Sequence, residues 1–214
     1  MKTRPFLIFD LDGTISDPAV GIERSINYAL QHYGYPTISE NEVPQFIGPP
    51  LDISFGAITG NSAPERIANL MAKYRERYAA IGYSENTLYE GIPEALNALA
   101  SAGVPIGLCT SKPVNFAENI LRLFGLREHF HFLNGGGIGI HKKQQLAELL
   151  SSGSICEASI MIGDRAVDIE AARANGLGAI GVLWGHGSIE ELQTAGPNKL
   201  LKSPNQLNEL RYVV

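Results

Sequence analysis

Cysteines and long hydrophobic runs are both scarce in this chain. Its 214 residues contain two cysteines, Cys109 and Cys156, which lie far apart in or beside apolar segments. Two distant cysteines make neither a disulfide framework nor a metal cluster, so we expect a reducing, cytoplasmic setting. No apolar run approaches the roughly 18 residues of a membrane-spanning helix, so no membrane segment is expected. The short apolar run before Asp10 does not resemble a signal peptide.

Excess positive charge is absent as well. The chain has 17 Lys and Arg residues against 22 Asp and Glu residues, which gives a formal net charge of −5. Binding to nucleic acid or to an anionic membrane needs a basic face, so we expect neither partner. A small anionic substrate is compatible with this charge, because a bound metal ion can supply positive charge locally.

The segment 6–16, with the sequence FLIFDLDGTIS, carries the strongest signal in the chain. Its uninterrupted apolar run is typical of a strand that is buried on both faces. Asp10 and Asp12 follow this run, at the strand end where α/β folds bind ligands. Two close carboxylates stay ionised together only beside a cation or hydrogen-bond donors, and Mg²⁺ prefers such oxygen ligands. One carboxylate could then act as a nucleophile and the other as an acid and base.

A turn that merely ends the strand is the alternative explanation for these two aspartates. The apolar strand before them and the Gly13–Thr14 pair after them favour the metal site over a simple turn. We therefore treat Asp10 and Asp12 as the candidate catalytic residues.

The next stretch, residues 17–84, has a helical pattern throughout. Apolar residues recur at helical spacing from Val20 to Leu30, and Gly34 ends that segment. Further helices are expected at 42–47, 52–58 and 64–81, with a break at Gly48-Pro49-Pro50. No strand is evident in this stretch. We interpret it as a four-helix domain inserted directly after the first strand.

From Leu88 onward, strands and helices alternate along the chain. Strands are expected at 104–109, 130–133, 159–162 and 179–184, and helices at 93–102, 114–124, 142–150, 166–174, 189–195 and 204–210. Such alternation predicts an α/β fold with a doubly wound parallel sheet, similar to a Rossmann core. The expected domains are a core of residues 1–16 and 85–214 and a helical cap of residues 17–84.

Polar residues stand at several of the expected strand ends. Thr110 and Ser111 follow the second strand, while Asp164 follows the fourth and precedes Asp168 by four residues. A lysine, Lys142 or Lys143, begins the helix before the fourth strand. Each of these residues alone has a simpler explanation, as a helix cap or as solvated surface. Together at one sheet edge, hydroxyls, a cation and helix N-terminal amides are typical of a phosphate site.

Three of these segments resemble motifs of the haloacid dehalogenase superfamily, and within it the chain resembles the phosphoglycolate phosphatase-like branch. The matching segments are Asp-Leu-Asp-Gly-Thr at 10–14, Thr-Ser-Lys at 110–112 and Gly-Asp-Arg-Ala-Val-Asp at 163–168. They match the family's first, second and fourth motifs, of which the first is highly specific, the second is weak alone, and the fourth is strong in combination. The inserted segment stands where this branch carries its helical cap.

The resemblance implies a role for each candidate residue. Asp10 would be the nucleophile that takes the phosphoryl group, and Asp12 would protonate the leaving oxygen and later activate water. Mg²⁺ would be held by Asp10, by the backbone carbonyl of Asp12 and by Asp164. The supporting residues would be Asp168, Gly13 and Thr14. The phosphoryl oxygens would be bound by Ser111 or Thr110 and by the third-motif lysine, which fits the demands of phosphoryl transfer.

The third-motif lysine has two candidates, Lys142 and Lys143. Lys142 is preferred, because Leu146, Leu149 and Leu150 then follow at the spacing of a core-packed helix. The preceding glycine-rich loop does not fix the register, so Lys143 stays open.

The implied activity is that of a magnesium-dependent phosphatase acting on a small phosphate monoester, as phosphoglycolate phosphatase does. A 5′-nucleotidase-type phosphatase is an alternative, because no Lys or Arg stands between Arg24 and Arg66 to bind a second anionic group. A sugar phosphomutase on the same scaffold and a non-catalytic binding protein are two further possibilities. The intact motifs argue against the binding protein. The chain is expected to be a monomer or a homodimer.

Overall fold

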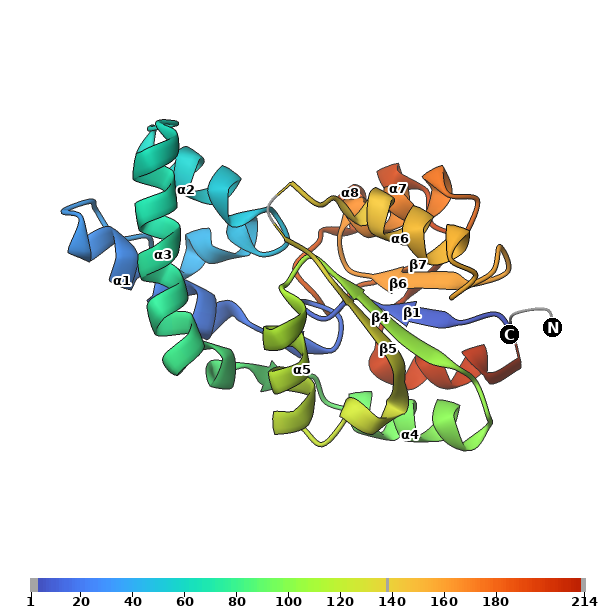
Figure 1. Cartoon of the computed structure of the whole chain (residues 1–214). Helices are drawn as coiled ribbons and strands as arrows, with labels where there is room; N and C mark the ends of the chain where they lie inside the picture. The colour runs from blue at the N-terminus through green and yellow to red at the C-terminus, as the bar shows by residue number, and fades with distance from the viewer. Residues whose placement is uncertain (1–3, 138, 213–214) are drawn as a thin grey trace. The chain divides into compact units, whose positions relative to one another are not determined.

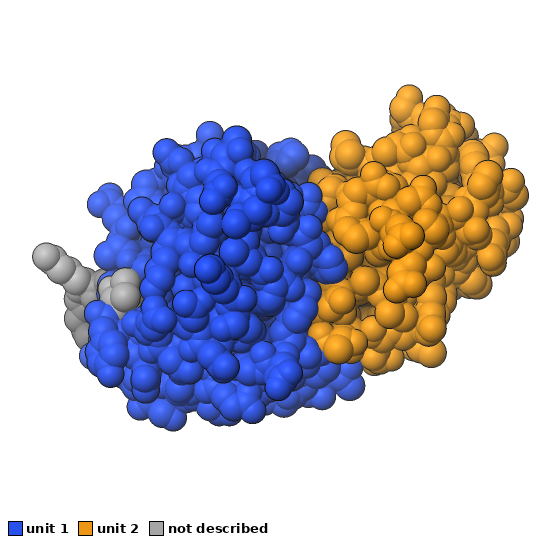
Figure 2. All heavy atoms as spheres, turned by 180° about the vertical axis from the view of Figure 1, so that it is seen from behind, with its two compact units in different colours: residues 1–16, 88–214 blue, residues 17–87 orange. Residues whose placement is uncertain are grey.

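The computed structural model describes residues 4–137 and 139–212, and the chain divides into two compact units. Unit 1 comprises Met1–Ser16 and Leu88–Val214, and unit 2 comprises Asp17–Thr87 (Figure 2). The segment 17–84, expected to form an inserted cap, lies within unit 2. That this segment acts as a cap domain stays a prediction.

Unit 1 is built on a six-stranded sheet with the order β5-β4-β1-β6-β7-β8. All five strand pairings in it are parallel, which confirms the α/β class with a parallel, Rossmann-like sheet. Its strands are β1 (Leu7–Phe9), β4 (Ile106–Thr110), β5 (Phe130–Gly135), β6 (Ile160–Gly163), β7 (Gly178–Val182) and β8 (Lys199–Leu201).

Helices cover both faces of this sheet (Figure 1). One face carries α6 (Lys142–Ser151), α7 (Ala166–Ala174) and α8 (Ile189–Ala195), and the other carries α4 (Ile92–Ser101) and α5 (Val114–Leu123). The 3₁₀ segment η4 (Pro204–Tyr212) packs against α4, and the short η3 (Arg127–His129) leads into β5. Because β1 lies mid-sheet between helix layers, all three of its side chains are fully buried.

Two parts of the sheet structure differ from the sequence-based expectation. The sixth strand, β8, was not expected, because three residues are too few to show a periodic pattern. Two-residue strands β2 (Ser16–Asp17) and β3 (Thr87–Leu88) form a separate small sheet, so the expectation of no strand from residue 17 onward was wrong at Asp17. The C-terminal helix expected at 204–210 is a 3₁₀ segment.

Unit 2 is helical, as its sequence pattern predicted. Its elements are α1 (Ala19–His32), η1 (Glu40–Phe46), α2 (Leu51–Thr59), α3 (Pro64–Ala80) and η2 (Gly82–Glu85). Tyr74 and Tyr78 of α3 stack with ring centroids 5.3 Å apart, and Tyr78 is buried. Tyr28, by contrast, is at the surface and donates its hydroxyl to Glu76. In the described part of the chain, no helix is long and apolar enough to cross a membrane.

Candidate active site

The end of β1 places Asp10 inside unit 1. The backbone N–H of Asp10 donates to the carbonyl of Ile162 at 2.9 Å, which extends the pairing of β1 with β6 by one residue. The Asp10 side chain is only 8% exposed. A carboxylate held this far from water needs partners that stabilise its charge.

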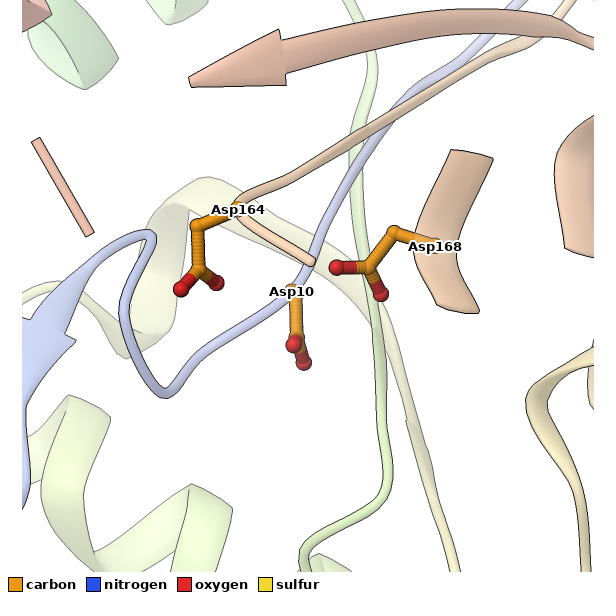
Figure 3. Close-up of side chains that lie close together, drawn as sticks. All are labelled: Asp10, Asp164 and Asp168. Atoms are coloured by element: carbon orange, nitrogen blue, oxygen red, sulfur yellow. The ribbon is translucent and has the colours of Figure 1, made fainter. Parts of the chain in front are cut away.

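Two further carboxylates approach Asp10 from the next strand of the sheet. Asp164 follows β6, and Asp168 lies in the first turn of α7 (Figure 3). One oxygen from each of Asp10, Asp164 and Asp168 lies within 4.8 Å of the other two. Burial, followed by the charges of Asp168 and Asp10, raises the pKa of the Asp164 carboxyl. Burial likewise raises the pKa of Asp168, although Lys142 acts in the opposite direction.

Lys142 supplies the positive charge between two of these carboxylates. Its Nζ lies 3.0 Å from Asp10 Oδ2 and also donates to Asp168 Oδ1. Burial alone would lower the pKa of this ammonium group, but Asp10 and Asp168 raise it above its usual range. Lys142 is the first residue of α6 and is buried, whereas its neighbour Lys143 is exposed. Of the two candidate lysines, the structure therefore brings only Lys142 to the carboxylates.

Asp12 is paired with a second lysine, which the sequence analysis quoted in a motif but gave no role. Lys112 Nζ lies 2.9 Å from Asp12 Oδ2, and the two side chains are 6% and 14% exposed. Burial raises the pKa of the Asp12 carboxyl, and the nearby ammonium of Lys112 opposes that rise. The position of Lys112, three residues beyond the end of the second expected strand, was the signal available in the sequence.

Thr110 and Ser111 differ in their surroundings at the end of β4. Thr110 is buried, and its Oγ1 accepts a hydrogen bond from the Lys112 backbone N–H at 3.3 Å. Ser111 is half-buried at the position immediately after the strand. Ser111 is thus the more accessible of the two candidate phosphate-binding hydroxyls.

Gln145 supports this strand end and was not identified from the sequence. Its Nε2 donates to the Thr110 carbonyl at 3.1 Å and to Asn134 Oδ1 at 2.6 Å. Gln145 stands three residues after Lys142 and therefore on the same side of α6. An amide residue three positions after the preferred lysine was the signal in the sequence that could have identified Gln145.

Asp164 is held from two loops. Thr14 Oγ1 donates to Asp164 Oδ1 at 3.2 Å, and the His186 backbone N–H donates to Asp164 Oδ2 at 2.9 Å. His186 therefore contributes to the site through its backbone. The indole N–H of Trp184 donates to the Thr14 carbonyl at 3.0 Å, which joins the two loops.

Glycine is required where these loops approach Asp164. Gly13 has φ +81°, and a Cβ atom there would lie 2.1 Å from Asp164 Oδ2. At Gly185, a Cβ atom would lie 2.2 Å from the Gly13 carbonyl oxygen. Any larger residue at either position would displace the Asp164 carboxylate or the loop.

Comparison with known proteins assigns this arrangement to a family. The model of the haloacid dehalogenase-like hydrolases matches residues 7–182, which is most of the chain and includes all the carboxylates above. The chain belongs to the haloacid dehalogenase-like hydrolase family.

Relatives of this haloacid dehalogenase-like hydrolase carry several names. A 5′-nucleotidase of Pseudomonas aeruginosa is 40% identical over 197 residues, which cover 90% of this chain and 89% of the relative. The tyrosine-protein kinase PtkA of Mycobacterium tuberculosis is 38% identical over 86% of this chain and 64% of its own length. A phosphoglycolate phosphatase of Yersinia pseudotuberculosis is 33% identical over 90% of this chain and 87% of its own.

A solved structure agrees with the fold. The crystal structure of a predicted phosphatase from Clostridium acetobutylicum superimposes with a TM-score of 0.89 at 34% identity, covering 97% of each chain. The family and the phosphoglycolate phosphatase-like branch expected from the three motifs are therefore confirmed. As a member of that branch, this haloacid dehalogenase-like hydrolase is an enzyme of the phosphoric monoester hydrolase class.

The carboxylate cluster of this hydrolase fits a divalent cation. Its donors are all carboxylate oxygens, which suit Mg²⁺. Asp10 Oδ1 is buried and has no hydrogen-bond partner among the described residues, which is expected of an oxygen that binds a cation. Asp168, and not Asp12, contributes the third carboxylate of this cluster. The Asp12 side chain is instead paired with Lys112. The backbone carbonyl of Asp12 as a Mg²⁺ ligand stays a prediction.

Proposed function

We propose that this protein is a magnesium-dependent phosphatase that hydrolyses a small phosphate monoester through an aspartyl-phosphate on Asp10. The observation that carries the proposal is the buried cluster of Asp10, Asp164 and Asp168 just beyond the end of β1, with Lys142 in contact with Asp10 and Asp168. Phosphoryl transfer depends mainly on positioning and charge neutralisation, and this set supplies both.

In the first step, a carboxylate oxygen of Asp10 attacks phosphorus and the ester P–O bond breaks. Asp12 gives its proton to the departing oxygen, so that an alcohol leaves. Burial supports this role, because it raises the pKa of the Asp12 carboxyl and favours the protonated form. The products are the alcohol and a phosphoryl group bound to Asp10.

In the second step, Asp12 takes a proton from a water molecule, whose oxygen attacks phosphorus. The bond between Asp10 and phosphorus breaks, inorganic phosphate leaves, and Asp12 is again protonated. The phosphoryl oxygens are bound throughout by Lys142 and the hydroxyl of Ser111. When bound by Asp10, Asp164 and the Asp12 carbonyl, Mg²⁺ would neutralise negative charge on the phosphoryl group.

The substrate class has two candidates. The branch membership supports a small phosphate ester such as phosphoglycolate. A 5′-nucleotide is the second candidate, because the relative named 5′-nucleotidase shares 40% identity and no Lys or Arg stands between Arg24 and Arg66. A second anionic group, such as the carboxylate of phosphoglycolate, is ordinarily bound by a Lys or Arg side chain.

A phosphate-release screen tests the proposal. Phosphoglycolate, a set of 5′-nucleotides, sugar phosphates and 4-nitrophenyl phosphate would each be incubated with the protein in excess MgCl₂ or in EDTA. We expect phosphate release from at least one ester with MgCl₂ and almost none with EDTA. Absence of release from every ester in both conditions would contradict the proposal, and transfer of phosphate between sugar positions would indicate a mutase instead.

A further inference from the structure

The two aspartates after β1 are each held by one lysine in the same way. Lys142 Nζ contacts Asp10 through Oδ2 at 3.0 Å, and Lys112 Nζ contacts Asp12 through Oδ2 at 2.9 Å. Both lysines are buried residues. A buried lysine loses most of its side-chain freedom and its hydration, so it fixes the oxygen it contacts more strictly than a surface lysine would.

The second carboxylate oxygen of each aspartate is not in contact with a lysine. Asp10 Oδ1 and Asp12 Oδ1 are buried and have no hydrogen-bond partner among the residues that the structure describes. Unpartnered buried oxygens are costly and are concentrated at functional sites. Each carboxylate thus has one oxygen held by a lysine and one oxygen left for another group.

We infer that Lys112 is a positioning residue for Asp12. By holding Oδ2, it directs Oδ1 toward the departing oxygen of the substrate, so that the proton is transferred from a fixed point. The inference rests on the proposed function, in which Asp12 is the acid and base, and it assigns Lys112 a task distinct from that of Lys142.

The fold explains how Lys112 reaches this position. The strands β1 and β4 are parallel neighbours, with Phe9 opposite Leu108, and Asp12 and Lys112 both lie shortly beyond the strand ends. The Lys112 backbone N–H is anchored on Thr110 Oγ1, and the Thr110 carbonyl is anchored by Gln145. Rigid support of this kind is what a residue that orients another side chain requires.

Direct binding of the substrate phosphoryl group is the competing role for Lys112. The two roles differ in their dependence on the leaving group. An alkoxide leaves only if it receives the proton of Asp12 as the P–O bond breaks, whereas 4-nitrophenolate leaves with its electron pair and needs no proton. Misdirecting the proton therefore slows alkyl esters selectively, while loss of phosphoryl binding slows both kinds of ester.

The test compares Lys112→Met with wild type on two substrates, the best alkyl phosphate and 4-nitrophenyl phosphate. The quantity measured is kcat/KM, because it reports the steps up to departure of the leaving group. We expect kcat/KM to fall by about 100-fold for the alkyl ester and by less than about fivefold for the aryl ester. Lys143→Met, which removes an exposed lysine of α6, should match wild type with both esters.

Two outcomes would overturn the inference. An equal fall in kcat/KM for both esters with a raised KM would assign Lys112 to phosphoryl binding, and unchanged values would assign it no role in turnover. If Lys112→Met does not fold, Lys112→Gln replaces it in the test. The inference again predicts a selective loss of kcat/KM with the alkyl ester. An unchanged ratio of kcat/KM between the alkyl and aryl esters would contradict it. Failure of wild type with both esters would instead refute the proposed phosphatase function.

Discussion

Asp10 and Asp12 stand two residues apart but have different surroundings. Asp10 lies beside Lys142 and the carboxylates of Asp164 and Asp168, while Asp12 faces Lys112. The first setting suits a nucleophile next to a cation, and the second suits a group that exchanges a proton. The difference arises from the strands on either side of β1, because β6 leads to Asp164 and β4 leads to Lys112.

Replacement of Asp10 by Asn should abolish turnover without unfolding the protein. An amide oxygen is a poor nucleophile, so we expect kcat to fall by at least about 10³-fold. Lys142 keeps its contact with Asp168 in this variant, which limits the loss of stability. Glu157→Gln makes the same chemical change at an exposed position and should retain full activity. Normal turnover by Asp10→Asn would show that another group attacks phosphorus.

Replacement of Gly13 by Ala should weaken Mg²⁺ binding. The added Cβ would lie 2.1 Å from Asp164 Oδ2, so the carboxylate must move. Gly103→Ala is the matched control, since Gly103 also has positive φ, +76°, but has no atom within 4 Å of the added carbon. Calorimetric titration with MgCl₂ should show about a tenfold or greater loss of affinity for Gly13→Ala only. Equal losses in both variants would point to backbone strain instead.

At the scale of elements, α6 shows what the sequence could and could not predict. The spacing of Leu146, Leu149 and Leu150 favoured Lys142 over Lys143, and the structure places Lys142 on the buried side. Periodicity reveals which residues face the core, but it does not reveal which polar groups meet there. The contacts of Lys142 with Asp168 and of Gln145 with Thr110 join segments far apart in the chain. Which of these segments meet depends on the order of the strands in the sheet, and that order cannot be read from the sequence.

Lys142→Met should destabilise unit 1 as well as remove activity. It leaves Asp10 and Asp168 buried without their cation, which typically costs about 3–5 kcal/mol. Urea unfolding in EDTA should show this loss in the free energy of unfolding, while Lys143→Met should differ little from wild type. Addition of MgCl₂ should recover more stability in Lys142→Met than in wild type, because the cation supplies the missing charge. A variant as stable as wild type in EDTA would contradict the account.

At the scale of the whole molecule, the sequence predicted the fold class, the α-helices and the strands β4, β5, β6 and β7, whereas the helices expected at 42–47 and 204–210 are 3₁₀ segments. It did not predict β8 or the pair β2 and β3, because strands of two or three residues show no periodicity. Of the site, it predicted the residues at the strand ends but not the supporting contacts from Lys112, Gln145 and the His186 backbone. Such residues have no chemical motif of their own, and only the folded chain shows what they contact.

Global stability should depend on pH through the carboxylate cluster. Burial raises the pKa of Asp164 from 3.8 to about 7, so in that interval the native state binds more protons than the unfolded state. The free energy of unfolding in EDTA should therefore fall as pH rises from 4 toward 7. Mg²⁺ should reverse the trend, since it binds the ionised carboxylates. Thermal unfolding across this pH range, with and without MgCl₂, measures both effects, and a rise in stability with pH in EDTA would contradict the prediction.

The most direct test of the central claim is to trap the phosphoryl group on Asp10. Asp12→Asn should still be phosphorylated by 4-nitrophenyl phosphate, whose leaving group needs no proton, but should hydrolyse the intermediate slowly. Rapid acid quenching and peptide mass spectrometry should then find a phosphoryl group on the peptide containing Asp10, and none in Asp10→Asn. Release of phosphate by wild type with no phosphorylated carboxylate at any quench time, in either wild type or Asp12→Asn, would contradict the account.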